Sequence, residues 1–384
     1  MELKPILPKE TIYSLDYIKF MLLASASSSR FGVINLYENN KIFKSRGNLN
    51  ALMIAPFGTG KTSQICSINN VKIETARSVS MPGLIGTITR DGQYLIGSCF
   101  NAGGKLLLID ECQSLPHLVK DAMNQLLEPP HEFRRDIGFK SVMPVHKKTR
   151  YAWVRGEENW FKIRSKFSCI ASGMRINLEN DVDKAWYSRF IPMRLKVDLD
   201  YIEKLVGGET IFEVNALDFA GDFEFKDYMK FRTYYFKKFR ESRWMKIFNL
   251  KQDDYGFIAR NTQDLARLAA FSAALDGTNE IELDHAIKMT DKWFHQILYN
   301  ILIGPLSDNE YKTIGLVDSM SQDEIAAILG ISQGEVSKII DFLKAKGIIT
   351  EKDKPTIDKE DKTVTKLSYD NTEDPTKKTK IEVS

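Results

Sequence analysis

The sequence lacks the features of secreted, membrane-spanning and metal-clustered proteins. Its 384 residues include four cysteines, which form no C-x-x-C pair, and five histidines without ligand spacing. We therefore expect free, buried thiols. No signal peptide opens the chain, and no apolar run approaches the roughly 20 residues that a membrane-spanning helix needs. These absences predict a cytoplasmic protein with no membrane partner.

The sequence also lacks a large excess of either charge. Lysine and arginine number 54 and aspartate and glutamate 51, which gives a formal net charge of +3. So small a balance does not by itself imply a nucleic-acid partner, and any basic surface must be local. A hydrophobic content of 43% is that of an ordinary globular protein, and the length suffices for two or three domains.

What the sequence does contain is a phosphate-binding loop. Residues 55–62 read Ala-Pro-Phe-Gly-Thr-Gly-Lys-Thr and follow the apolar run 51–54; Ala55 stands where the full pattern has glycine. Small residues let the backbone turn around an anion, Lys61 can reach the β- and γ-phosphates, and the Thr62 hydroxyl can ligate Mg²⁺. ATP and Mg²⁺ are therefore the predicted cofactors. The predicted binding residues of the loop are Pro56, Phe57, Gly58, Thr59, Gly60, Lys61 and Thr62.

An acidic pair follows a second apolar run. Leu106–Ile109 reads as a buried strand, and Asp110 and Glu111 come directly after it. At the carboxyl end of such a strand, Asp110 can hold Mg²⁺ through a water molecule, and Glu111 can polarise the attacking water. An acidic pair that only caps a helix is the alternative.

Two further residues are candidates for catalysis. Ser172 ends the predicted strand around Phe167–Ala171 and is placed to orient the attacking water. Arg189, in Ser-Arg-Phe, is placed to act as an arginine finger, which ring-forming ATPases supply from the next subunit. A surface arginine that pairs with Asp183 is the alternative.

Predicted strands and helices alternate over residues 1–223, which indicates an α/β layered domain with a parallel sheet. They include a helix at 10–27, strands at 71–74 and 106–109, a hairpin around Asp91-Gly92 and a helix at 118–127. Residues 224–303 turn helical, with helices at 228–244, 261–275 and 283–302. Residues 370–384 are polar and lysine-rich, typical of a disordered tail.

Residues 306–369 have the pattern of a winged helix-turn-helix. Ser321 and Glu324 form a capping box before one helix, with Ile325, Ile328 and Leu329 as its apolar positions, and Gln333–Lys346 forms the next. Residues 347–350 and 363–368 can pair as the wing. On the second helix, Gln333 and Lys338 are candidate DNA contacts. Nearby acidic residues weaken that assignment, and docking to a protein is the alternative.

The segment 142–167 is the strongest DNA-contact candidate. It is predicted to be a long two-stranded excursion, and cations alternate in it with Tyr151, Trp153 and Trp160. Cations can contact phosphates while aromatic rings stack on bases. A solvated charged hairpin is the alternative. The candidate cations are Lys147, Lys148, Arg150, Arg155, Lys162 and Arg164.

Several motifs in this order resemble the AAA+ core of the minichromosome maintenance (MCM) replicative helicases. They are Arg46–Asn50 before the loop, Gly83-Leu84, the hairpin, Asn101–Gly104 before the acidic strand, Lys120–Gln125, Ser188-Arg189-Phe190 and Arg260–Leu268. The resemblance spans about residues 10–300. It implies a helical lid in which Arg260 senses nucleotide, and basic hairpins in the pore of a ring.

The chain departs from that family at several points. It has Gly60-Lys61-Thr62 where the family ordinarily has Ala-Lys-Ser, Ser172 where the family has an asparagine, and no N-terminal oligonucleotide-binding domain with its zinc site. The resemblance therefore fits a minimal relative of a kind carried by a virus, plasmid or other mobile element, in a nucleoid or in host cytosol.

The resemblance implies an ATP-driven DNA helicase or translocase in replication. It would work as a homo-oligomeric ring, by resemblance a hexamer, around single-stranded or forked DNA, with other replication proteins as further partners. A AAA+ initiator, loader or remodelling switch without processive unwinding is the alternative.

Overall fold

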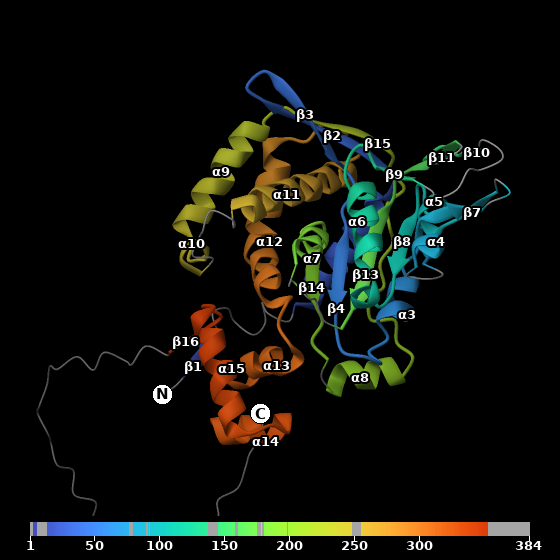
Figure 1. Ribbon diagram of the computed structural model, residues 1–384. Coiled ribbons are helices and arrows are strands. Elements are labelled where there is room, and N and C mark those ends of the chain that lie inside the picture. The colour runs from blue at the N-terminus through green and yellow to red at the C-terminus, as the bar shows by residue number, and fades with distance from the viewer. Residues whose placement is uncertain are drawn as a thin grey trace, which may run out of the picture. The chain divides into compact units, whose positions relative to one another are not determined.

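A parallel sheet of five strands forms the middle of the fold (Figure 1). It consists of β4 (Ala51–Ile54), β5 (Ile73–Thr75), β8 (Leu106–Ile109), β13 (Ser168–Gly173) and β14 (Ile191–Arg194). The strands lie in the order β14, β4, β13, β8, β5. The structure, a computed structural model, describes residues 3–5, 14–76, 80–89, 91, 93–136, 145–157, 160–174, 178, 180–197, 199–247 and 255–351.

Two strands of this sheet, β4 and β8, are continuous apolar runs because helices cover both of its faces. Successive side chains of a strand point to opposite faces. In β4, Ala51 and Met53 join one hydrophobic core, whereas Leu52 and Ile54 join the other. One core includes side chains of α2 (Leu15–Ser27), α3 (Lys61–Cys66), α11 (Tyr255–Leu275) and α12 (Leu283–Ile303). The other includes side chains of α4 (Met81–Leu84), α5 (Ser98–Asn101), α6 (His117–Leu126) and α7 (Asp181–Tyr187). The mixed α/β architecture that the sequence predicts is thereby confirmed.

The register of the strands brings the candidate site together. Ala171 of β13 pairs with Leu52 of β4 on one side and with Ile109 of β8 on the other. The carboxyl ends of the three neighbouring strands are therefore level. Each end is followed by, or contains, a predicted site residue.

The excursion at 142–167 is not two-stranded, and the prediction was wrong on this point. It belongs to a four-stranded antiparallel sheet in the order β10 (Val145–Lys148), β11 (Ala152–Glu157), β12 (Trp160–Ser165) and β9 (Glu132–Asp136). Ile163 of β12 pairs with Phe133 of β9, and both side chains are buried. The apolar face of β12 is therefore covered with the help of β9, a strand that precedes the excursion in the sequence.

Within the described residues, three smaller sheets contain the other strands. β2 (Phe31–Glu38) lies between β3 (Lys41–Arg46) and β15 (Gly221–Phe225), and β6 (Gly86–Ile88) pairs with β7 (Tyr94–Ile96) as the predicted Asp-Gly hairpin. β16 (Ile349–Glu351) pairs with β1 (Leu3–Pro5) near the start of the chain. Its predicted wing partner at 363–368 lies outside the described residues, as does the predicted tail at 370–384.

The other helices in the described part of the chain are α8 (Leu199–Val206), α9 (Tyr228–Glu241), α10 (Trp244–Ile247), α13 (Asp308–Leu316), α14 (Gln322–Leu329) and α15 (Gln333–Ala345). The sequence predicted α9, α14 and α15 with slightly different ends, and it did not predict α8, α10 or α13. The predicted capping box of α14 is present. The chain through Glu351 packs as one compact unit, and the boundaries of the lid and of the winged helix-turn-helix stay predictions.

Two single-residue expectations were wrong. Cys66 is exposed, unlike Cys99, Cys112 and Cys169, because it lies on the outer side of the short helix α3. Ile328, expected in the core beside Ile325, is 56% exposed. Within the described part of the chain, no helix is both long and apolar enough to cross a membrane.

Candidate functional site

The phosphate loop joins β4 to α3 in a tight turn that depends on glycine. Gly58 and Gly60 have φ angles of 76° and 66°, in the left-handed region that side chains disfavour. The turn is held from within, because Thr59 Oγ1 donates a hydrogen bond to the Pro56 carbonyl at 2.9 Å. It is also held from α8, because the Tyr201 hydroxyl donates to the Thr59 carbonyl at 2.9 Å. These two hydrogen bonds thus fix the backbone of the loop from both sides.

Lys61 folds its amine back across this loop. Nζ donates to the carbonyl oxygens of Ala55 at 3.0 Å and of Pro56 at 2.8 Å. Burial lowers the pKa of Lys61, and the Asp110 carboxylate opposes that shift. The cation lies inside the loop, where phosphate oxygens can replace the two carbonyl partners.

Asp110 is held between the loop and the middle strand. Thr62 Oγ1 donates to Asp110 Oδ2, and Ser172 Oγ donates to Asp110 Oδ1, both at 2.5 Å. Burial alone would raise the pKa of Asp110, but the hydrogen bonds from Ser172 and Thr62 lower it below its ordinary value. The carboxylate is therefore ionised and fixed in place at neutral pH.

The donors at this position fit Mg²⁺. Thr62 and Asp110 supply a hydroxyl and a carboxylate oxygen side by side, and Mg²⁺ favours one or two such ligands together with phosphate and water oxygens. Among the described residues, no cluster of three or more histidine, cysteine, aspartate or glutamate side chains suits a metal ion.

Glu111 has an unusual backbone conformation beside Asp110. Its φ of 52° lies in the left-handed region, which is uncommon for residues other than glycine and occurs often at functional sites. Glu111 is exposed and lines a hollow of about 340 Å³ together with Lys61, Thr62, Asp110 and Gly173. The predicted residues Phe57–Thr62, Asp110 and Glu111 thus surround one space, whereas Pro56 and Ser172 do not line it.

Arg189 and Arg260 do not line that hollow. They meet at Glu128, just after α6: Arg260 Nη2 lies 3.0 Å and Arg189 Nε 3.8 Å from Glu128 Oε1. Arg260 also donates to the Ser188 hydroxyl. The predicted finger and the predicted sensor therefore form one arginine pair, apart from the chain's own phosphate loop.

A buried arginine supports this pair. Arg46 donates to the backbone carbonyls of Leu127 at 2.6 Å and of Arg189 at 2.7 Å. Burial alone would raise the pKa of Glu128, but the charges of the surrounding arginines lower it to about 2. Burial lowers the pKa of Arg189 to about 10, which still leaves it charged at neutral pH.

The four-stranded sheet turns a basic, aromatic face outward. Across it, His146, Arg155, Lys162 and Arg134 pair in register, as do Lys148, Trp153, Arg164 and Glu132. Directly paired residues point to the same side, and the opposite side is buried through Val154, Phe161 and Ile163. The Arg134 guanidinium lies 4.6 Å from the Trp160 ring centre, and the Lys162 amine 5.8 Å from that of Trp153.

The predicted DNA contacts divide between this face and its surroundings. Lys148, Arg155, Lys162 and Arg164 share the face, although Lys162 also pairs with Glu132. Lys147 pairs with Val154 and so belongs to the other side of the edge strand, and Arg150 lies in the turn before β11. Gln333 and Lys338 are exposed on α15. Arg90, at the tip of the earlier hairpin, lies outside the described residues.

Sequence reasoning missed three residues that organise these sites. Glu128 and Arg134 were not predicted, because only long-range packing brings them to their partners. Arg194, at the end of β14, was also missed. Its guanidinium donates to Asp308 at 2.9 Å and to the Leu306 carbonyl at 2.7 Å. An arginine that ends a buried strand was a usable signal for it, since such a charge needs partners.

Comparison with models of protein families gives no match for this chain, and comparison with curated proteins gives none either.

Proposed function

We propose that the protein is an ATPase of the AAA+ type, similar to the MCM helicase core, that uses ATP hydrolysis to move along DNA as a ring. The observation that carries the proposal is the separation of two half-sites within one chain. Lys61, Thr62, Asp110 and Ser172 converge at the carboxyl ends of β4, β13 and β8, whereas Arg189 and Arg260 converge on Glu128.

The first half-site supports binding and hydrolysis of a nucleoside triphosphate. In this proposal Lys61 neutralises the β- and γ-phosphates, while Thr62 and Asp110 hold Mg²⁺, which supplies charge stabilisation to the phosphates. Glu111 polarises the attacking water. Ser172 orients the Asp110 carboxylate, because its hydroxyl donates a hydrogen bond to that group.

The second half-site supports a shared active site. An arginine finger contributes about 10³–10⁵ in rate when it reaches the transferred phosphate. Because neither arginine lines the chain's own hollow, a neighbouring copy is the partner that the pair would serve. Head-to-tail contacts of this kind form a ring when the rotation between successive copies closes.

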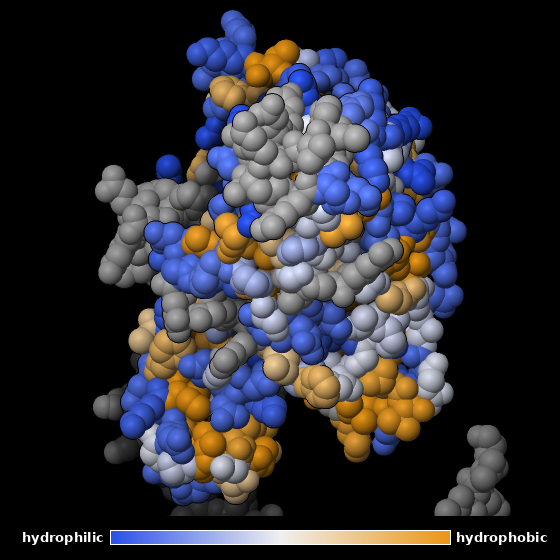
Figure 2. Space-filling model, turned by 45° about the vertical axis from the view of Figure 1, so that its right-hand side comes forward, coloured by the Kyte–Doolittle hydropathy of each residue, from blue (hydrophilic) through white to orange (hydrophobic). Residues whose placement is uncertain are grey.

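The surface beside the phosphate loop supports such a contact. Phe57 in the loop is 80% exposed, and Leu199 and Val206 of α8 are 71% and 82% exposed. Figure 2 shows apolar surface gathered at the lower end of the molecule, the end at which α8 and the C-terminal helices lie in Figure 1. Large exposed apolar patches often mark protein contacts.

The basic sheet face supports nucleic acid as the translocated partner. Cations on this face can contact phosphates, and Trp153 and Trp160 offer rings for stacking. An initiator or loader of the same AAA+ type is the second candidate, and the exposed Gln333 and Lys338 on α15 favour it, since a helix-turn-helix can bind duplex DNA or a protein.

Glu111→Gln tests the hydrolytic assignment. We expect this change to abolish ATP turnover and to leave ATP binding intact, because the neutral amide keeps the shape of the side chain but lacks the charge with which the carboxylate activates water. Glu241→Gln, an exposed acid at the end of α9, is the matched control and should retain turnover. Normal turnover by Glu111→Gln would remove the basis of the proposal. A strand-displacement assay on forked DNA then distinguishes a helicase from a switch, because a switch hydrolyses ATP without unwinding the DNA.

A further inference from the structure

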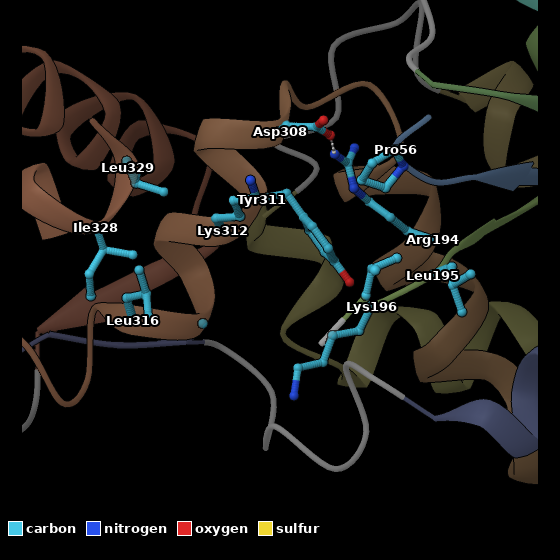
Figure 3. A pocket seen from close by; sticks show the side chains of 12 residues that line it. Pro56, Arg194, Leu195, Lys196, Asp308, Tyr311, Lys312, Leu316, Ile328 and Leu329 are labelled. Atoms are coloured by element: carbon cyan, nitrogen blue, oxygen red, sulfur yellow. Dashed lines mark hydrogen bonds and ion pairs between the residues drawn. The ribbon is translucent and has the colours of Figure 1, made fainter. Parts of the chain in front are cut away.

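A second hollow lies on the other side of the phosphate loop, between the sheet and the C-terminal helices. Its volume is about 430 Å³. Figure 3 shows Pro56, Arg194 and Leu195 on one side and Leu316, Ile328 and Leu329 on the other, with Tyr311 between them. The C-terminal helices α13 and α14 thus build a wall that faces the end of β14.

Pro56 connects this hollow to the phosphate site. It belongs to the loop itself, its carbonyl accepts from Lys61, and the next residue, Phe57, lines the phosphate hollow. The charge of Asp308, on α13, also acts on the Lys61 amine. The two hollows therefore border consecutive residues of one loop.

The walls of the second hollow combine aliphatic and aromatic side chains with the charged groups of Arg194, Lys196, Asp308 and Lys312. The Tyr311 ring lies 4.2 Å from the Arg194 guanidinium, which Asp308 and the Leu306 carbonyl hold in place. Leu316, Ile328 and Leu329 add aliphatic surface. Small-molecule sites are mostly apolar and preformed, and an aromatic base packs well on such walls. The exposure of Ile328, unexpected for its position in the helix, is explained if a ligand covers it.

We propose that this hollow receives the heterocyclic base of the nucleotide whose phosphates bind at Lys61, so that the C-terminal helices form one wall of the base site. The inference rests on the proposed nucleotide-binding function. It adds that α13 and α14 contact the ligand directly.

Binding measurements on the full-length protein test the inference. Titration calorimetry with Mg²⁺ compares ATP with inorganic tripolyphosphate, which has the phosphates but no base. We expect ATP to bind more tightly. Ile328→Glu should weaken ATP binding by about fivefold to tenfold, because it removes apolar cover and places a charge against the base, and should leave tripolyphosphate binding unchanged. Leu316→Glu serves as a second variant on the same wall.

The control is Phe342→Glu, which alters an apolar side chain of α15 that is 38% exposed and does not line the hollow. It should bind both ligands as the unaltered protein does. The base site would be contradicted if both wall variants bind ATP as tightly as the unaltered protein does. It would also be contradicted if they lose equal affinity for ATP and for tripolyphosphate. Neither result would contradict the phosphate site. If the unaltered protein binds neither ligand, the proposed function fails together with the inference.

Discussion

Arg260 donates to the Glu128 carboxylate at 3.0 Å, and Arg189 approaches the same oxygen from the end of another helix. Two residues that the sequence assigns to separate roles, finger and sensor, are thus held as a pair. One carboxylate partly balances both charges. A phosphate from a neighbouring copy would meet both guanidinium groups at once.

Glu128→Gln should destabilise the protein in a pH-dependent way. The pKa of Glu128 is about 2 in the folded chain against an ordinary 4.5. The stability that this carboxylate contributes is therefore complete above about pH 4.5 and is lost as the pH falls through about 2, and it amounts to about 3 kcal/mol. Urea unfolding at pH 7 and at pH 3 measures the gap between the two proteins, which should narrow at pH 3. A gap that is the same at both pH values would contradict the arginine–carboxylate cluster, and Glu203→Gln provides the exposed control.

Ser172→Ala should act through Asp110. Loss of the Ser172 hydrogen bond raises the pKa of Asp110 toward its ordinary range, so the acid side of the pH–turnover profile should move to higher pH. The Mg²⁺ concentration needed for half-maximal turnover should rise as well. Ser168→Ala changes a buried serine at the other end of β13 and should leave both quantities unchanged. If turnover is slower but the acid side of the pH profile does not shift, Ser172 acts on the attacking water and not on Asp110.

Replacing Arg155 and Arg164 together by alanine should weaken binding of single-stranded DNA and reduce its salt dependence. Each lost phosphate contact lowers the slope of log affinity against log salt by about 0.7 on single strands. Fluorescence anisotropy with an oligothymidine at several salt concentrations gives the slope. Replacing Lys230 and Lys237 of α9, both exposed, removes the same charge elsewhere. Equal effects of the two double variants would mean that the sheet face is no specific contact surface.

Trp153→Ala tests stacking on the same face. Base–aromatic stacking contributes about 1–3 kcal/mol per base, and this contribution persists at high salt. We therefore expect a loss of affinity with an unchanged salt slope. A changed slope with no loss at high salt would assign Trp153 to packing against Lys162 instead.

The parts of this molecule that sequence could predict are those set by neighbouring residues. The loop with Gly58 and Gly60, the apolar strand before Asp110 and the Ser321 capping box are all local, and the structure has them as expected. The predictions that failed depend on contacts between residues that are distant in sequence. β9 joins the sheet of the excursion because Ile163 needs Phe133, and Glu128 gains its role only when α6, α7 and α11 pack together. No local pattern contains that information.

The central claim is that one active site is built from two copies of the chain. Lys61→Ala removes the binding half-site and Arg189→Ala the arginine half-site, so each variant alone should lack turnover. Mixed in equal amounts and allowed to exchange subunits, they should regain about a quarter of normal ATP turnover, because about a quarter of random head-to-tail contacts join an intact Lys61 to an intact Arg189. A mixture as inactive as its components, despite proven exchange, would contradict the shared site.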